Sequence, residues 1–481
     1  MNGAPASIAS PETSLDATFV LSCWLILIAA IFVSLYAALE LRILYADGSN
    51  VLLGMLEKGG FHLYEPSRRY VEFMYEFPVV LAIKLGVDSI PALIVCYGIT
   101  IYLLPLLLIS ICYFVLPPDK KSYFVFPLLH YLAGTTSSSF GGLVEGPVAA
   151  AYFWLLLYIL LFRFERKVWM VVSLLALPAV YLHEVMFFLA PLLAAVAVWR
   201  ASQEKRKTGA IQFALLAIWF LVIAAVQIFF IINPRDPANR SSFIYGFTHL
   251  LWLVTTSGQV NVPALAGLLA ILVLAGLVVF ERYNNRTILE KVRRLLVIGF
   301  AVVSFSMIAV TFVTEKFITP WMQFQARNHA AFISFPLALF AILSSVHPPM
   351  TLLWKKRQNI GVITILAVTV LSWHVAATHR WTIYLDDFRS ILSTSQGLIP
   401  YKQACGNLPD GRKSNFQNMT WVHTNPTLSF LLSPKGRVTA VIDNPDRGGR
   451  WKPFDPNNPN SLPHSRFFDS GPYRETIEAA K

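Results

Sequence analysis

Two carboxylates stand where an apolar segment gives way to a polar loop, and both could take part in acid–base chemistry. Asp47 directly follows the first apolar segment in the run Tyr45-Ala-Asp47-Gly48, and Glu145 ends a loop of small residues just before Pro147. A carboxylate at such a boundary could accept a hydroxyl proton while that hydroxyl attacks an activated carbon. Glu145 could instead bind a metal or a hydroxyl group. Both have a structural alternative as helix caps, which Pro147 would assist in the second case.

A second candidate is the adjacent pair His183-Glu184, which lies in a tight turn between two apolar segments. Ionisable groups at a membrane edge are rare and costly, so each such group is a candidate for function. An acid beside an imidazole could form a proton relay or bind a substrate. The structural alternative is a polar turn that caps the next helix.

Basic side chains in the polar loops could bind a phosphate group, because Arg contacts phosphate through two hydrogen bonds and Lys supplies a compact charge. A lipid-linked phosphate at the outer leaflet would need such residues. The alternative is ordinary anchoring of loops at the membrane interface. The candidates, with a neighbouring imidazole, are Arg68, Arg69, Lys316, Arg327 and His329.

The elements that must position these residues are predicted to be membrane-spanning helices. The chain has 481 residues, of which 56% are hydrophobic and 14% are charged, whereas soluble domains carry roughly 25% charged residues. We expect an all-α polytopic membrane protein with about eleven spans. The expected spans are residues 18–43, 89–116, 122–134, 147–164, 168–181, 185–200, 210–232, 262–281, 295–314, 329–346 and 359–378.

The distribution of basic residues predicts the orientation. Seventeen Lys and Arg residues lie in one set of short alternate loops, and eight are spread over the longer loops of the other set. The positive-inside rule makes the richer set cytoplasmic, which places the N-terminus inside and the C-terminal region outside. The net charge of +12 is then mostly topological and contacts membrane lipids, so nucleic-acid binding is not implied.

Two regions outside the expected spans have a character of their own. The first outer loop, 45–88, contains amphipathic stretches at 51–58 and 69–85 that suit interfacial helices, the second bent or divided at Pro78. Residues 379–481 form a separate extracytoplasmic region after the transmembrane domain of residues 1–378. Strand-like runs at 427–432 and 437–442 predict a small α+β appendage.

Several chemistries lack support in the sequence. The chain contains no P-loop, no dinucleotide-binding fingerprint and no His-Glu-x-x-His motif. The four cysteines form no pattern that indicates a disulfide or a zinc site. His130 and His374 lie in apolar runs and are interpreted as packing residues.

The arrangement resembles the C-type fold of integral membrane glycosyltransferases. The resemblance covers roughly residues 18–345 and rests on Asp47 at the outer end of the first span, a long first loop with interfacial helices, Glu145 in the small-residue loop, and the His183-Glu184 turn. It implies transfer of a sugar from a polyprenyl-phosphate carrier to a glycan or glycolipid acceptor at the outer face, with Asp47 as the base. No cofactor is expected, and a divalent metal is left open; the acidic pair common in that loop is Asp47-Gly48 here.

Two alternative functions stay open. A polysaccharide polymerase or ligase would use the same class of donor, but it needs a large outer loop between late spans. A transporter of lipid-linked saccharides predicts paired repeats and charges near the middle of the membrane. Here the ionisable groups gather at the outer edge, so transfer of a sugar is the preferred interpretation.

Overall fold

The structure is a computed structural model, and most of the chain is described. The described residues are 11–136, 140, 145–163, 168–234, 255–256, 259–281, 286–314, 327–346, 357–421, 424–433, 439–442 and 465–468. Within helices and strands, the side chains of residues 11–16, 168, 255–256, 259, 279–281, 286–289, 327–332 and 357 are outside the description.

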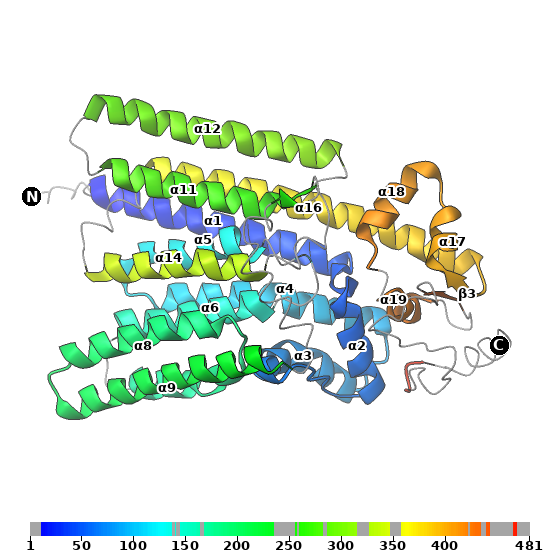
Figure 1. Cartoon of the computed structure of the whole chain (residues 1–481), viewed down its shortest axis with the longest axis horizontal. Coiled ribbons are helices and arrows are strands. Elements are labelled where there is room, and N and C mark those ends of the chain that lie inside the picture. The colour runs from blue at the N-terminus through cyan, green and yellow to red at the C-terminus, as the bar shows by residue number, and fades with distance from the viewer. Residues whose placement is uncertain are drawn as a thin grey trace, which may run out of the picture.

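Apolar helices lie side by side and form the body of the molecule (Figure 1). Within the described part of the chain, seven helices are long and apolar enough to cross a membrane. They are α1 (Pro11–Leu39), α4 (Ile90–Val115), α6 (Glu145–Phe162), α8 (Met186–Gln203), α9 (Lys207–Ile232), α12 (Arg286–Val313) and α16 (Arg357–Thr394). Three more apolar stretches are shorter and belong to α7 (Val168–Ala176) with η6 (Pro178–Tyr181), α11 (Val262–Glu281) and α14 (Arg327–Val346). A helical membrane-protein fold is therefore supported, while the count of eleven spans stays a prediction.

The outer helices of the bundle present apolar side chains outward. On α9, Leu215 and Phe229 are each 60% exposed, and on α12 Leu295 is 67% exposed. Helix α6, in contrast, has nearly its whole length buried by its neighbours. Wide exposed apolar faces are unfavourable in water but suit hydrocarbon, so this burial pattern fits a membrane location with α6 at the centre.

The segment expected as the shortest span, 122–134, is an irregular helix at the centre of the bundle. It begins as a 3₁₀ helix, η3 (Pro118–Phe124), continues as α5 (Val125–His130) and ends in one π-helical turn, η4 (Tyr131–Thr135). All residues of α5 and η4 are buried. Irregular backbone is tolerated at membrane depth where it is buried in protein, as it is here.

The π-helical turn leaves no room for a side chain on the helix that crosses it. A Cβ atom added to Gly267 of α11 would lie 2.7 Å from the Cα atom of Ala133. We expect Gly267→Ala to destabilise the protein by about 1–3 kcal/mol, because backbone must move to relieve the clash. Thermal unfolding in detergent would measure it. The matched control is Gly299→Ala on α12, where an added Cβ meets nothing within 4 Å; equal losses in both variants would contradict the packing argument.

A buried polar network joins this central segment to two helices. His130 accepts a hydrogen bond from the indole Nε1 of Trp154 on α6, at 2.7 Å, and its other ring nitrogen meets the hydroxyl of Ser334 on α14. All three side chains are almost fully buried. Because Trp donates to Nδ1, the proton of the neutral ring lies on Nε2. The network supports the packing role expected for His130.

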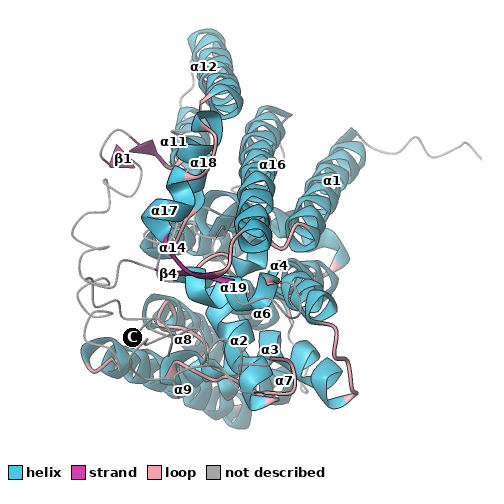
Figure 2. Cartoon of the chain, turned by 90° about the vertical axis from the view of Figure 1, so that its right-hand side faces the viewer, coloured by secondary structure: helices cyan, strands magenta, loops and turns pink. Residues whose placement is uncertain are grey.

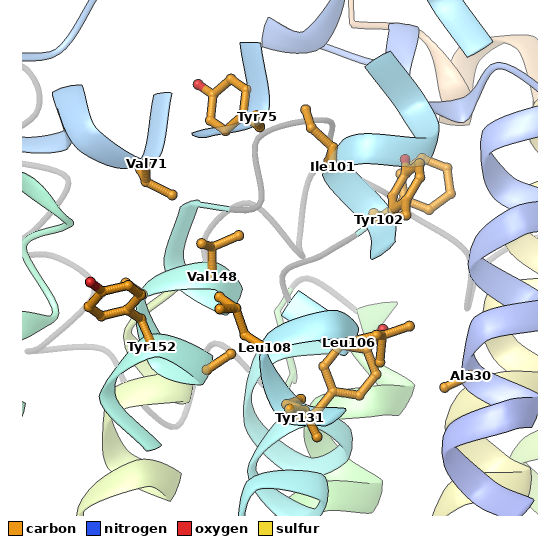
Figure 3. Packing of buried hydrophobic residues seen from close by; sticks show 14 of the residues in the cluster. Ala30, Val71, Tyr75, Ile101, Tyr102, Leu106, Leu108, Tyr131, Val148 and Tyr152 are labelled. Atoms are coloured by element: carbon orange, nitrogen blue, oxygen red, sulfur yellow. The ribbon is translucent and has the colours of Figure 1, made fainter. Parts of the chain in front are cut away.

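Short elements gather beyond one end of the bundle (Figure 1, right; Figure 2). Those from the first loop are η1 (Arg42–Leu44), α2 (Asp47–Lys58), η2 (Pro66–Arg68) and α3 (Arg69–Lys84). The two helices correspond to the expected interfacial stretches, and α3 runs through Pro78 without ending. Figure 3 shows Val71 and Tyr75 of α3 among buried side chains of α4 and α6. Helix α3 is therefore packed on the bundle through one face.

The C-terminal region continues from the bundle and packs against the first loop. Helix α16 extends through residue 378 to Thr394. It is followed by β3 (Gly397–Pro400), α17 (Tyr401–Gly406), α18 (Asp410–Met419), α19 (Asn425–Leu432) and β4 (Thr439–Ile442). Strands β3 and β4 pair in parallel, and a second two-stranded pair, β1 (Thr255–Thr256) and β2 (Gln259–Val260), is antiparallel. The Thr427 hydroxyl donates to Asn50 of α2 at 2.6 Å.

One of the two predicted strands in this region is wrong. Residues 427–432 belong to helix α19, which starts with Pro426 in its first turn and buries most of its length. Pro at that position favours a helix start, and tertiary burial of the apolar residues overrides their strand propensity. The other predicted strand, 437–442, is confirmed at its end by β4.

Two of the basic residues used to predict orientation lie at the opposite end of the bundle. Arg163 donates to the carbonyl oxygen of Val115 at 2.7 Å, and Arg200 donates to that of Leu160 at 2.6 Å. Both acceptors belong to the last turns of α4 and α6, where carbonyl groups lack helical partners. These residues therefore have a structural role, and the predicted orientation stays a prediction.

Candidate functional site

Arg68 is the centre of a buried ion-pair network at the end that carries α2 and α3. Its Nη1 atom lies 2.7 Å from Glu145 Oε2, and its Nε atom lies 2.9 Å from Glu184 Oε2. Arg68 ends η2, Glu145 begins α6, and Glu184 precedes α8, so three distant parts of the chain meet here. Burial alone would lower the pKa of Arg68, but the two carboxylates hold it well above its usual value. The guanidinium occupies the place between them that a metal ion would take.

The His183-Glu184 pair is part of the same network. Glu184 also accepts a hydrogen bond from the hydroxyl of Ser67 at 2.7 Å, and His183 Nε2 lies 3.4 Å from its Oε2 atom. His183 Nδ1 accepts from the backbone N–H of Val185, so the proton of the neutral ring lies on Nε2. Burial would raise the pKa of Glu184, yet Arg68 and His183 lower it overall. Glu184 therefore stays ionised and orients its neighbours.

Two further glutamates, one helical turn apart, lie on the buried face of α3. Glu72 accepts hydrogen bonds from the backbone N–H groups of Tyr64 and Glu65, both at 2.9 Å. Glu76 accepts from the backbone N–H of His62 at 2.7 Å, and its Oε1 atom has no hydrogen-bond partner among the described residues. These bonds hold residues 62–65 against the helix.

Burial makes both glutamates weaker acids. It raises the pKa of Glu72 to about 8, and nearby Glu145 adds to the increase, while the backbone N–H bonds oppose it. Burial likewise raises the pKa of Glu76 to about 7. Near neutral pH both carboxyl groups are therefore partly protonated, which limits the negative charge of the site.

Two tyrosines, Tyr75 and Tyr97, lie beside these glutamates. Their ring centroids are 6.0 Å apart, and both residues are within electrostatic range of Glu72, Glu76 and Glu145. The Tyr97 hydroxyl is buried and has no hydrogen-bond partner among the described residues. Together with the protonated glutamates, these phenols supply donors and acceptors of the kind that bind hydroxyl groups.

Asp47 lies next to this group, at the first residue of α2. It is half-buried, and it is within electrostatic range of Tyr45 and Tyr97. Ala46 occupies the N-cap position, and its side chain makes no capping hydrogen bond. Asp47 therefore follows the N-cap position as the first helical residue, where an acidic side chain interacts favourably with the helix N-terminus. Glu145 does begin a helix, with Pro147 in its first turn, and it binds Arg68 as well.

The structure places the other predicted site residues apart from this network or outside the description. Arg69 is exposed at the start of α3. Arg327 and His329 lie in the first turn of α14, and their side chains are not described; Lys316 lies outside the described residues. The cations expected to meet a phosphate therefore cannot be placed beside Asp47. Among the described residues no three His, Cys, Asp or Glu side chains form a group that could hold a metal ion.

Sequence reasoning missed Glu72, Glu76 and Arg42. The first two have a signal, because residues four apart share a helix face and α3 was expected to lie on the membrane surface with one side covered. Arg42 was counted as the end of the first span. The structure buries it, with 3% of its surface exposed.

The raised pKa values predict a pH-dependent stability. A buried acid whose pKa is higher in the folded state binds more protons when folded, so stability falls as pH rises from about 4.5 to about 7. Glu76→Gln keeps an acceptor for His62 and removes the charge. We expect Glu76→Gln to raise the free energy of unfolding at pH 8 by about 2–3 kcal/mol more than it does at pH 4.5.

Thermal unfolding across this pH range would measure the effect. The control is Glu57→Gln, which neutralises an exposed glutamate on α2. A stability gain at pH 4.5 as large as that at pH 8 would contradict the assignment, because the protonated glutamate and glutamine should then be equivalent.

Comparison of the chain with protein-family models, curated proteins and solved structures finds no match in any of the three. The functional interpretation therefore rests on the geometry of the site.

Proposed function

We propose that this chain is an integral membrane glycosyltransferase that moves a sugar from a polyprenyl-phosphate carrier to a glycan or glycolipid acceptor at the end of the bundle that bears α2 and α3. One observation carries the proposal. Three buried glutamates and the partly buried Glu184 and Asp47, drawn from three separate regions of the chain, gather at one end of a bundle of apolar helices. A polar chamber bordering hydrocarbon suits a substrate that has a sugar at one end and a lipid at the other.

The reaction we propose is a direct displacement. The oxygen of the acceptor hydroxyl forms a bond to the anomeric carbon, and the bond between that carbon and the phosphate oxygen breaks. The hydroxyl proton passes to the carboxylate of Asp47, and the carrier leaves as polyprenyl phosphate with the electron pair of the broken bond. Asp47 is preferred as the base because it is only partly buried, whereas Arg68 holds Glu145 and Glu184.

The other residues position the substrate and the surrounding helices, and they take no part in making or breaking bonds. The Arg68 network fixes η2 and α3 against the starts of α6 and α8. Glu76 and Tyr97 each present a buried polar atom without a hydrogen-bond partner among the described residues, and sugar hydroxyl groups would satisfy both. Lys316, Arg327 and His329 remain the proposed contacts of the leaving phosphate.

Turnover by the wild-type protein is the direct test. The full chain, purified in detergent, would be incubated with a panel of polyprenyl-phosphate sugars and with acceptor glycolipids. Transfer of sugar in step with release of the free carrier supports the proposal, and nucleotide sugars serve as a control donor class. If no donor is consumed, while the same preparation moves lipid-linked saccharides between the leaflets of vesicles, the transporter alternative replaces the transferase.

A further inference from the structure

The backbone at Ala46, directly before Asp47, adopts a conformation that favours glycine. Its φ angle is 50° and its ψ angle is −129°. Among the described residues other than glycine, Leu41 is the only other with a positive φ angle. A Cβ atom is strained in this region because it approaches the neighbouring peptide groups. Such a conformation persists only where the surrounding structure holds it, so contacts around Ala46 must offset the strain.

Hydrogen bonds tie this strained residue to the start of α2. The backbone N–H of Gly48 donates to the Tyr45 carbonyl oxygen at 3.3 Å and so closes a tight turn of four residues. Asp47 lies in the middle of this turn. The Ala46 carbonyl oxygen accepts from the backbone N–H and from the hydroxyl of Ser49, at 3.3 and 2.9 Å. A change in the φ angle of Ala46 would therefore break the turn and move the Asp47 carboxylate.

The Tyr45 side chain is enclosed by three aromatic rings from distant parts of the chain. The rings belong to Phe140, to Trp381 on α16, and to Trp421, which lies beyond α18. Their centroids lie 5.1, 5.7 and 6.1 Å from that of Tyr45, and all three contacts are edge-to-face, a favoured geometry for aromatic pairs. These four rings form an aromatic box, in which Tyr45 is only 2% exposed. Tyr45 cannot move without displacing its neighbours.

Two rings of the box, Trp381 and Trp421, belong to the C-terminal region. The first lies where α16 extends beyond the bundle, and Figure 1 shows this helix running from the bundle toward α17 and α18. Helix α19 adds the hydrogen bond from Thr427 to Asn50 of α2. The C-terminal region therefore contacts the first loop on both sides of Asp47.

We propose that Tyr45 is a positioning residue for Asp47 and that the C-terminal region holds it in place through the aromatic box. The edge-to-face contacts offset the unfavourable conformation of Ala46, and the resulting turn fixes the Asp47 carboxylate at the start of α2. This inference rests on the proposed role of Asp47 as the base. It assigns the C-terminal region a part in the reaction that does not require contact with the substrate.

Kinetics of the full chain test this role through kcat and KM. Trp421→Leu removes one ring of the box at a partly exposed position. We expect it to lower kcat by about 10²-fold, the effect of misplacing a reacting group by roughly 1 Å, with little change in the KM for the donor. Trp421→Phe, which keeps an aromatic ring, should retain most of the rate.

The matched control is Tyr401→Leu, which removes a partly exposed ring of the same region. Tyr401 stacks on Phe416, with 6.0 Å between the ring centroids, and is not part of the box. This variant should leave kcat unchanged. An equal loss in Trp421→Leu and Tyr401→Leu would indicate general damage to the C-terminal region and would overturn the proposal. If Trp421→Leu does not fold, Tyr45→Leu, which removes the central ring, is judged by the same comparison.

A change in the backbone at residue 46 separates positioning from general packing. Glycine accepts a positive φ angle without strain, so with Ala46→Gly the turn depends less on the aromatic box. Combined with Trp421→Leu, this substitution should recover about tenfold of the lost kcat. An unchanged kcat in folded Trp421→Leu, or a double variant with no recovery, overturns the proposal.

Hydrogen exchange tests the hold on the turn without any turnover. The amides of Gly48 and Ser49 donate within the turn. They should exchange about tenfold faster in Trp421→Leu than in the wild type or Tyr401→Leu, because local opening becomes easier. Faster exchange in a protein whose wild type transfers no sugar supports the hold on the turn and rejects the proposed function. Unchanged exchange and kcat in folded Trp421→Leu, with an active wild type, rejects the positioning role and leaves the proposed function standing.

Discussion

Replacing Asp47 with asparagine is expected to lower the rate of sugar transfer by about 10²- to 10⁴-fold, the usual contribution of a general base. Asparagine has nearly the same shape but cannot accept the hydroxyl proton. The carboxylate lies at the start of α2, half-buried and near Tyr45 and Tyr97. Loss of the base should lower kcat with little change in donor binding. Carrier release and sugar transfer, followed at saturating donor, would measure the effect.

The control for Asp47→Asn is Asp410→Asn, which neutralises a fully accessible aspartate on α18 whose ion pair with Lys413 is local. It should leave the rate unchanged. Asp47→Glu, which keeps the carboxylate but moves it, should retain more activity than Asp47→Asn. If Asp47→Asn turns over normally in a folded preparation, Asp47 is not the base, and Glu145→Gln becomes the variant to examine.

The helices of this chain are predictable because long apolar runs have few other solutions in a membrane. Each expected span coincides with helical residues, including the irregular segment from Pro118 to Thr135. The interfacial helices α2 and α3 also follow from amphipathic spacing within the chain. What local patterns could not predict is the burial of 427–432 as a helix, since that depends on contact with α2, distant in the sequence.

The site was predictable in its residue types but not in its pairings. Glu145, His183 and Glu184 stand out because ionisable groups are rare near apolar segments, and the structure brings them to Arg68. The sequence does not show that two carboxylates hold Arg68, whereas no carboxylate of the described residues lies within ion-pair distance of Arg42. A charged residue at the end of a span is interpreted as a membrane anchor from the sequence, because its partners on distant helices are not known.

The buried Arg42 lies close to the part of the chain that carries Asp47. Tyr45 packs edge-on against Phe140, with 5.1 Å between the ring centroids, and Phe140 also covers Arg42. Asp47 follows Arg42 by five positions in the chain, so their Cα atoms are within about 18 Å of each other.

Arg68→Gln is expected to have the largest effect on stability. Glu145 and Glu184 have side chains only 5% and 16% exposed, and each would lose its cation. Breaking a buried ion pair by removing one partner costs about 3–5 kcal/mol, because a charge is left without compensation. Unfolding in detergent, followed by circular dichroism against temperature, would measure the loss. Arg69→Gln, which removes the neighbouring exposed arginine, is the matched control and should change stability little.

The pH dependence and a compensating variant distinguish lost charge pairing from lost packing. In the wild type, the pKa of Glu184 is lower in the folded protein than in the unfolded chain. Glu184 therefore contributes stability when the pH is above its unfolded-state pKa, and this contribution is lost as the pH falls through its folded-state pKa. Without Arg68, burial would favour protonated carboxyl groups, so the deficit of Arg68→Gln should be smaller at pH 5 than at pH 8. Adding Glu145→Gln and Glu184→Gln removes the unpaired charges and should restore much of the loss. If the triple variant is no more stable than Arg68→Gln alone, the network stabilises the protein through packing, and the electrostatic explanation of its contribution is wrong.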